Sequence, residues 1–259
     1  MISGVSVGAL NAAHVASYPK GQEKEMSDDL LSLWTAMEPS NFYRNWRYGG
    51  IVRGLLFEQG LYDTSPLHEF IKAYFESRTI HRPFHINSVD AQTGDIVGFD
   101  ETSTIADLIT GLCASTAVPF VFPPVKYLGH VLMDGGVAWN LDIASAIRKC
   151  RELVDSDEKI FLDVIDVDRA LNQVQIWNKT GNSVQNYLRA RSLKNYYKRM
   201  DDQFSIQQAF PKVNYRYVIA PKVELDPIYQ ELSLDHELVM RLIDMGMQDA
   251  LDAIQSSIV

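Results

Sequence analysis

The stretch ISGVSVGALNAA, residues 2–13, decides the fold, because it predicts a sharp turn between a strand and a helix. It contains a G-x-S-x-G sequence from Gly4 to Gly8, with Ser6 at its centre. In such a turn the serine is held in a strained conformation that projects its hydroxyl, and glycine on either side permits close packing. The helix beginning at Val7 points free N–H groups toward the site. The stretch therefore predicts Ser6 as a nucleophile and the Val7 amide as an oxyanion donor.

The G-x-S-x-G pentapeptide alone is weak evidence, because a chain of this length contains it by chance about one time in ten. A glycine-rich turn whose serine merely caps the helix explains it equally well. The small residues from Ala9 to Ala13 favour a nucleophile, since they let a helix lie close against a sheet directly after the serine.

Downstream of this turn, the sequence predicts strands that alternate with helices. Residues 84–91 and 95–99 alternate in polarity around a Gln-Thr-Gly turn and predict a β-hairpin. Further strands are expected at residues 131–133, 159–165 and 214–219, and helices at residues 65–75, 104–113, 142–150, 183–200 and 235–254. This alternation predicts an α/β fold with a mostly parallel central sheet and helices on both faces.

Length and composition limit the organisation and the partners. We expect a core at residues 1–165 and a helix-rich extension at residues 166–259 that completes the same domain. The net charge of −9 repels phosphate backbones, so no nucleic-acid partner is expected. No apolar run is long enough to cross a bilayer and two cysteines cannot build a disulfide framework, which favours a cytoplasmic location. No spacing is typical of a metal site, and neither metal nor cofactor is expected.

A serine nucleophile needs a base, for which histidine is the usual candidate. Among the six histidines, His236 follows in the chain order of an α/β-hydrolase triad, but its surroundings are typical of a helix start. Asp134 is the better candidate, because it ends a short apolar strand and precedes Gly135 and Gly136, at the sheet edge where ligand groups gather. An Asx turn that stabilises the bend explains Asp134 as well.

Three segments in succession carry a family resemblance. ISGVSVGALNAA, CASTAVPFVFPPV at residues 113–125 and VLMDGGVAWN at residues 131–140 resemble the signatures of patatin-like phospholipases, in the order of that family. The resemblance implies a patatin-like three-layer sandwich and a catalytic dyad without histidine, in which Ser6 is the nucleophile and Asp134 its base. It further implies acyl-ester cleavage through an acyl-enzyme, with a phospholipid or neutral glycerolipid as substrate, and transient contact with a membrane surface.

The apolar segment from Pro119 to Val125 is expected to exclude water from this chemistry and to hold the acyl chain. Pro119, Phe120 and Phe122 are the lining residues that we predict for such an acyl pocket. Ordinary core packing explains the same side chains equally well.

The resemblance has one departure. Patatin-like proteins have a first strand and a glycine-rich oxyanion loop before the elbow, and the five residues before Ser6 do not include them. Losing one oxyanion donor lowers turnover by about 100- to 1,000-fold, so we expect weak activity from this chain. Two alternatives to a Ser–Asp enzyme stay open: a catalytically impaired module that binds lipid, and an α/β-hydrolase esterase that uses His236.

Overall fold

The computed structural model describes residues 1–167, 182–222 and 235–256. The chain forms two compact units, Met1–Lys149 and Cys150–Val259. The expectation that residues 166–259 complete one domain with residues 1–165 stays a prediction, and part of that extension lies outside the described residues.

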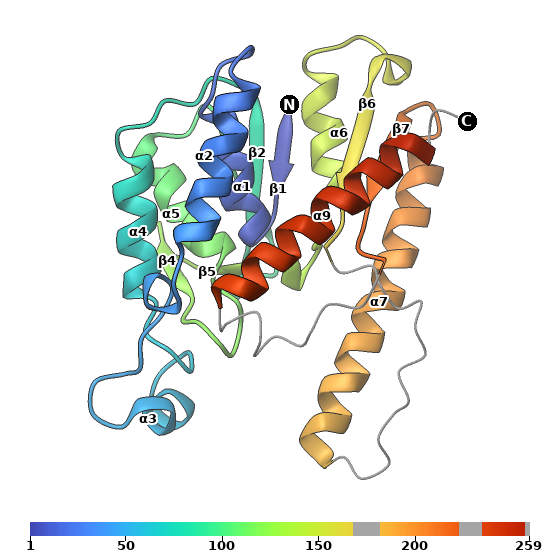
Figure 1. Ribbon diagram of the computed structural model, residues 1–259. Helices are drawn as coiled ribbons and strands as arrows, with labels where there is room; N and C mark the ends of the chain where they lie inside the picture. The colour runs from blue at the N-terminus through green and yellow to red at the C-terminus, as the bar shows by residue number, and fades with distance from the viewer. Residues whose placement is uncertain (168–181, 223–234, 257–259) are drawn as a thin grey trace. The chain divides into compact units, whose positions relative to one another are not determined.

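A five-stranded mixed sheet forms the centre of the first unit (Figure 1). Its strands are β1 (Ile2–Gly4), β2 (Phe84–Asp90), β3 (Ile96–Asp100), β4 (Val125–Tyr127) and β5 (His130–Asp134). β1 runs parallel to β2, whereas β3 and β5 run antiparallel to β2, and β4 antiparallel to β5. The mixed α/β class is confirmed, but the expectation of a mostly parallel sheet is wrong. The reason is that β2–β3 and β4–β5 are hairpins, whose short turns reverse the chain.

The register along β2 brings two strand ends together. β3 pairs with β2 from His85 to Val89, so β1 and β5 share the opposite edge of β2. β1 ends with Gly4 opposite Ile86, and β5 ends with Asp134 opposite Ser88. Because β1 and β5 run toward each other along one edge, the residues that follow β1 lie beside the end of β5.

Four helices build one face of the unit. They are α1 (Val7–Ala16), α2 (Glu23–Ala36), α4 (Ser65–Phe75) and α5 (Ile105–Ser115). α1 and α5 pack directly on the sheet, α4 packs on α5, and α2 packs on α1. Phe84 and Ile86 of β2 point into this layer and share a buried apolar cluster with Ala9, Leu112 and Phe75. The small side chains of α1 allow its backbone to lie close to the sheet, as the sequence predicts.

On the other face of the sheet, β2 is linked to the start of α6 (Ile143–Arg151). Successive side chains of a strand point to opposite faces, so His85 and Asn87 point away from the layer that holds Phe84. Asn87 hydrogen-bonds Asp142, which caps α6 by accepting from the amide of Ser145 at 3.0 Å. Helices on both faces, and hence the three-layer sandwich, are confirmed.

The connection between α2 and α4 contains η1 (Pro39–Asn41) and a further helix, α3 (Gly50–Phe57). The backbones of Arg44 and Asp63 exchange two hydrogen bonds of 3.0 Å, which join the two ends of the loop that contains α3. Sequence periodicity does not predict α3, since eight residues with two glycines make a marginal helix.

The second unit pairs β6 (Phe161–Ile165) with β7 (Asn214–Ile219) in parallel. Its described helices are η3 (Asp157–Lys159), α7 (Ser183–Ala209) and α9 (His236–Ser256), and α9 packs on β7. The expected strands and helices of this region are confirmed, although α7 continues beyond its predicted end at Met200. No helix within the described ranges is long and apolar enough to cross a bilayer.

Candidate active site

Ser6 occupies the turn between β1 and α1 in a strained conformation, with φ 57° and ψ −132°. Such a backbone is rare for a residue with a side chain and is found where surrounding structure enforces it. A Cβ atom on Gly4 would stand 2.0 Å from the carbonyl oxygen of Gly8 and 2.9 Å from the Cβ of Ala12. The close approach of α1 to β1 therefore requires glycine at position 4. At position 8 it does not, because no atom lies within 4 Å of where a Gly8 Cβ would stand.

The Ser6 hydroxyl contacts the predicted base directly. Its Oγ donates a hydrogen bond to Oδ2 of Asp134 at 2.5 Å. The amide of Gly136 donates to Oδ1 of the same carboxylate at 2.7 Å, and the amide of Asp134 donates to the carbonyl of Ala117 at 3.0 Å. Both oxygens of Asp134 are therefore held, and one of them faces the serine.

Burial controls the ionisation of Asp134, whose exposed fraction is 4%. Removal from water raises the pKa of its carboxyl from 3.8 to about 6, although the hydrogen bonds from Ser6 and Gly136 lower the pKa in part. At pH 7 the carboxylate is therefore still ionised, and it is a stronger base than an exposed aspartate.

Steric contacts explain why both residues after Asp134 are glycines. A Cβ on Gly135 would stand 2.0 Å from Oδ1 of Asn87, and one on Gly136 would stand 2.9 Å from Oδ1 of Asn140. These glycines let the chain turn into η2 (Gly135–Val137) while Asp134 keeps its carboxylate against Ser6. Asp134 also makes the Asx-type contact of the alternative interpretation, because its Oδ1 accepts from the amide of Gly136.

Ser115 supports the turn that contains Ser6, and the sequence patterns did not predict this role. Its Oγ accepts a hydrogen bond from the amide of Ser6 at 3.0 Å, and its side chain is fully buried at the end of α5. This bond satisfies the backbone N–H of a strained residue. The signal was present in the segment CASTAVPFVFPPV, which contains Ser115 and carries the family resemblance.

A buried polar group supports the Asp134 turn from the other face of the sheet. Nδ2 of Asn87 donates to Oδ2 of Asp142 at 2.6 Å, and Nε2 of His85 lies 3.9 Å from the same oxygen. Burial lowers the pKa of His85, which keeps its ring neutral. Oδ1 of Asn87 and Nε2 of His85 have no hydrogen-bond partner among the described residues. Asn87 thus lies against Gly135 with one atom of its side-chain amide and holds Asp142, the cap of α6, with the other.

The amino end of α1 supplies the predicted oxyanion donor. Among the described residues, no acceptor takes the backbone N–H of Val7 or Gly8. Both amides lie at the positive end of the helix, directly after the Ser6 hydroxyl. The Val7 amide is therefore available to an anion that forms at Ser6.

The predicted acyl-pocket residues differ in their environments. Phe122 is buried and packs near the ring of Tyr43, Pro119 is half-buried, and Phe120 is 64% exposed with φ 74°. The acyl-binding role of these three residues stays a prediction. A cavity of about 10 Å³, room for one water, lies instead between α1, α2 and α4, where Leu10, Trp34, Phe42 and Tyr74 are among its lining residues.

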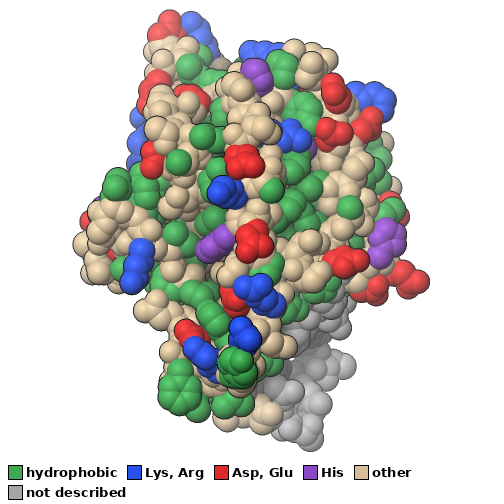
Figure 2. Space-filling view, turned by 90° about the vertical axis from the view of Figure 1, so that its left-hand side faces the viewer, with side chains coloured by type: hydrophobic (Ala, Val, Ile, Leu, Met, Phe, Trp, Pro, Cys, Tyr) green, Lys and Arg blue, Asp and Glu red, His purple; other side chains and the backbone are tan. Residues whose placement is uncertain are grey.

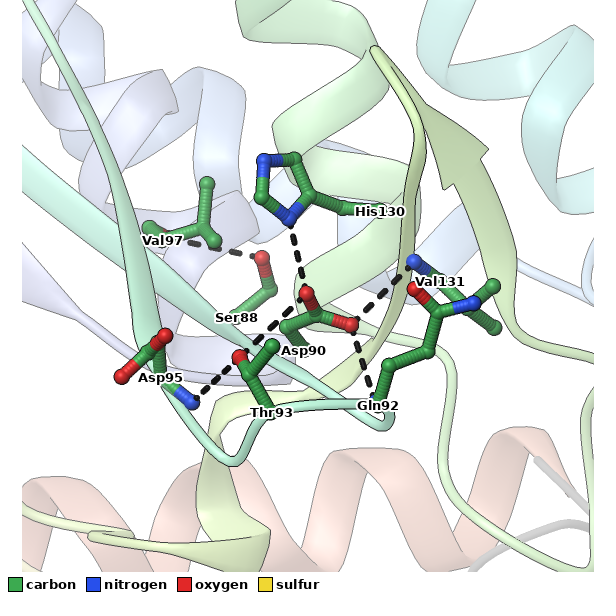
Figure 3. Close-up of polar contacts among 8 residues, drawn as sticks. All are labelled: Ser88, Asp90, Gln92, Thr93, Asp95, Val97, His130 and Val131. Atoms are coloured by element: carbon green, nitrogen blue, oxygen red, sulfur yellow. Dashed lines mark hydrogen bonds and ion pairs between the residues drawn. The ribbon is translucent and has the colours of Figure 1, made fainter.

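The hydrogen bonds of Ser6 to side chains are with Ser115 and Asp134, and no described histidine takes part in them. His14 is buried between the hydroxyl of Tyr74 and the carbonyl of Met26. Figure 3 shows Nδ1 of His130 on Oδ2 of Asp90, at 2.7 Å, within a network that joins the ends of β2 and β5. That bond is the first cause of the lowered pKa of Asp90. His236 begins α9 in the second unit, in the helix-start context that the sequence indicates.

No group of three or more His, Cys, Asp or Glu side chains within residues 1–167, 182–222 and 235–256 is placed to hold a metal ion. The expectation that the protein uses no metal and no cofactor stays a prediction.

Comparison with known families identifies the family of the chain. A family model described as patatin-like phospholipase matches residues 1–147, more than half of the chain. The comparison with curated proteins returned no match. The matched range contains the whole five-stranded sheet, the Ser6 elbow and the Asp134 turn. The chain therefore belongs to the patatin-like phospholipase family.

Proposed function

We propose that this protein is a serine hydrolase that cleaves the acyl esters of lipids, with Ser6 as nucleophile and Asp134 as base. The family supports lipid acyl hydrolysis in general. One observation carries the assignment to these residues: the Ser6 hydroxyl donates to a buried carboxylate at 2.5 Å from within a strained strand-to-helix turn. That contact places a proton acceptor on the nucleophile before substrate arrives.

The reaction proceeds as a double displacement. Asp134 takes the proton of Ser6 as Oγ attacks the ester carbonyl, and the Val7 amide stabilises the oxyanion that develops. The tetrahedral intermediate collapses to an acyl-serine, and the alcohol leaves with the proton that Asp134 held. Asp134 then takes a proton from water as the water oxygen attacks the acyl-serine. The second tetrahedral intermediate collapses, the fatty acid leaves, and Asp134 returns the proton to Oγ of Ser6.

The surroundings of the dyad support each step. Ser115 fixes the Ser6 amide, and Gly136 fixes the carboxylate oxygen that does not face the serine. The raised pKa of Asp134, about 6, places the base close to the working pH, where proton transfer in both directions is efficient. The site thus holds its reacting atoms through backbone contacts rather than through a histidine.

The proposed substrate is a phospholipid or a neutral glycerolipid, the substrates that the family resemblance implies. Such lipids reside in bilayers and droplets, so the protein meets them by transient contact with a lipid surface. We propose a cytoplasmic location, peripheral to membranes, and no nucleic-acid partner, in keeping with the net charge of −9.

Active-site labelling tests this function. Wild-type protein, Ser6→Ala, Asp134→Ala and the control Ser32→Ala are incubated with a fluorophosphonate probe and with a short-chain p-nitrophenyl ester, and folding is followed by circular dichroism. We expect labelling and turnover from wild type and Ser32→Ala, and neither from the other two. Ser32 is an exposed serine of α2 that bonds only its own helix among the described residues, which makes it the matched control.

Two outcomes contradict the proposal. If all four proteins fold and none is labelled, the chain is a lipid-binding module without catalytic power. If Asp134→Ala keeps wild-type turnover and His236→Ala abolishes it, the base is histidine and the α/β-hydrolase alternative holds.

A further inference from the structure

The helix α3 exposes apolar side chains over most of its surface. Tyr48, Ile51, Val52, Leu55, Leu56 and Phe57, here called the α3 surface, are exposed by between 49% for Ile51 and 80% for Phe57. A helix at the surface of a protein in water normally turns polar residues outward. Scattered apolar side chains on a surface need no explanation, but six within ten consecutive residues do.

The packing of α3 explains why its apolar side points outward. Gly54 is the buried residue of the helix, and a Cβ there would stand 2.3 Å from the carbonyl oxygen of Leu61. The helix therefore lies on the segment that follows it through its glycine backbone. Ile51 and Leu55, and likewise Val52 and Leu56, are four residues apart and form adjacent rows on the side away from Gly54.

The residues that follow α3 are hydrogen-bonded to the segment at residues 117–121, and the same segment is hydrogen-bonded to Asp134. The amide of Leu61 donates to the carbonyl of Phe120 at 3.0 Å, and the amide of Tyr62 donates to that of Val121 at 3.1 Å. Three residues before Phe120, the carbonyl of Ala117 accepts from the amide of Asp134 at 3.0 Å. Figure 1 shows α3 toward the end of the first unit at which the β1 arrow points, and Ser6 follows β1 in the chain. The α3 surface and the candidate active site thus lie at one end of the first unit.

The charge around α3 is balanced except at Arg47. Residues 39–57 contain three arginines, at positions 44, 47 and 53, and no acidic residue. Arg44 pairs with Asp63 and Arg53 with Glu58, each at 2.7 Å, which leaves Arg47 as the arginine of this stretch without an ion pair among the described residues. Figure 2 shows hydrophobic side chains close to basic and acidic ones at the lower end of this face, where α3 lies. The Arg47 guanidinium lies over the Tyr48 ring, 5.1 Å from its centroid. Apolar and aromatic side chains mixed with arginine are typical of surfaces that bind anionic lipid head groups.

We propose that the α3 surface docks the protein onto a membrane that carries anionic lipids. The rows of Ile51, Val52, Leu55 and Leu56 enter the boundary between head groups and acyl chains, and Arg47 meets lipid phosphates. Docking at this end brings the Ser6 turn toward the layer that contains the ester bonds. This inference rests on the proposed function, since a lipid substrate is the reason for contact with a bilayer.

Vesicle binding of the full chain tests the docking surface. Ser6→Ala is present in every sample, so that binding is measured without turnover. Vesicles of phosphatidylcholine with and without phosphatidylglycerol are sedimented with this parent protein, with Leu55→Ser/Leu56→Ser, with Arg47→Gln and with Leu31→Ser/Ile105→Ser. The last variant is the matched control, because Leu31 and Ile105 are also exposed apolar residues of helices, on α2 and at the amino end of α5.

We expect the parent protein to bind the anionic vesicles more tightly than the neutral ones. Leu55→Ser/Leu56→Ser is expected to weaken the partition coefficient about tenfold or more, because two apolar side chains no longer enter the bilayer. Arg47→Gln is expected to weaken it about fivefold at low salt, and only with anionic vesicles. The control variant is expected to bind as the parent does.

Equal binding by the parent and Leu55→Ser/Leu56→Ser overturns the proposal, and so does a parent that binds no vesicles. If light scattering shows a dimeric parent and a monomeric Leu55→Ser/Leu56→Ser variant with unchanged vesicle binding, a second copy of the chain covers the α3 surface, which also overturns it. Because no sample can turn over, failure here is distinct from failure of the proposed function, which is read from ester hydrolysis by wild type.

Discussion

At the scale of single residues, Asp134 has to satisfy two opposed requirements. It is 4% exposed, which raises its pKa to about 6, and it must be ionised to accept the proton of Ser6. Burial makes the carboxylate a better base and at the same time reduces the fraction that is ionised below pH 6. The hydrogen bonds from Ser6 and Gly136 favour the ionised form and keep the pKa below neutrality.

The pH dependence of turnover follows from this pKa. Because the base must be unprotonated, kcat/KM for a short-chain ester is expected to rise about tenfold per pH unit below pH 6 and to level off above it. A series from pH 4.5 to 8.5 measures the profile, with circular dichroism at each pH as the control for folding. A profile that is flat across pH 6 would contradict Asp134 as the base.

Ser115 is a positioning residue whose loss is expected to affect kcat more than KM. Ser115→Ala removes the acceptor of the Ser6 amide and leaves a buried N–H unsatisfied, which costs about 1–3 kcal/mol. Without this hydrogen bond we expect the Ser6 hydroxyl to move away from Asp134, so that kcat falls about tenfold or more while KM is unchanged. Ser115→Thr restores the hydroxyl and is expected to recover part of kcat. Ser17→Ala, which removes a buried serine hydroxyl at the end of α1, serves as control. Equal kcat in Ser115→Ala and wild type would remove the positioning role.

At the scale of elements, the approach of α1 to β1 sets the elbow. A side chain on Gly4 would overlap the backbone of Gly8, whereas a side chain on Gly8 meets open space. The two glycines of one motif are therefore unequal, although the sequence pattern treats them alike. α1 lies against Gly4 of β1, and Ser6, which joins β1 to α1, has a strained backbone conformation.

This asymmetry predicts different stabilities for two alanine variants. Gly4→Ala is expected to lower the free energy of unfolding by about 3 kcal/mol or more, since strand and helix must separate to admit the methyl group. Gly8→Ala is expected to leave it unchanged or raise it by up to about 1 kcal/mol, because alanine favours a helix over glycine. Urea denaturation of both variants beside wild type measures the difference. Equal destabilisation by the two would mean that steric contact at Gly4 does not set the elbow.

At the scale of the whole molecule, the catalytic carboxylate is linked to global stability. The folded protein holds the Asp134 proton up to about pH 6, whereas an unfolded chain releases it near the ordinary value of 3.8. Between these values the folded state binds more protons, so the contribution of Asp134 to stability decreases as the pH rises from about 4 to above 6. A shift of two pKa units corresponds to about 3 kcal/mol.

Asp134→Asn is therefore expected to be inactive but more stable than wild type at pH 8, by up to about 3 kcal/mol. The gain should shrink to below about 1 kcal/mol at pH 4, where the folded carboxyl is protonated and the unfolded one is about 40% protonated. Urea denaturation at pH 4, 6 and 8 measures it, and Asp107→Asn, at the exposed start of α5, is the comparison. A gain that does not depend on pH would show that something other than ionisation of Asp134 causes it.

Local patterns of the sequence predicted most of the elements. The G-x-S-x-G turn and the hairpin of β2 and β3 depend on residues close together in the chain, and the structure confirms them. The caps of α5 by Thr104 and of α6 by Asp142 are equally local. α3 escaped prediction because its folding depends on Gly54 lying on Leu61, which no periodicity reveals. Ser115 escaped because its partner, Ser6, is 109 residues away.

By itself, the sequence determined the α/β class, the family and the two residues proposed for catalysis, since each is written in short motifs whose physics is local. Only the tertiary structure decided the direction of the strands, the contact between Ser6 and Asp134, the pKa of that carboxyl and the outward side of α3. These four depend on which distant segments meet. β2 aligns the ends of β1 and β5 through backbone hydrogen bonds that any sequence of strand residues can make, and burial follows only once that alignment exists.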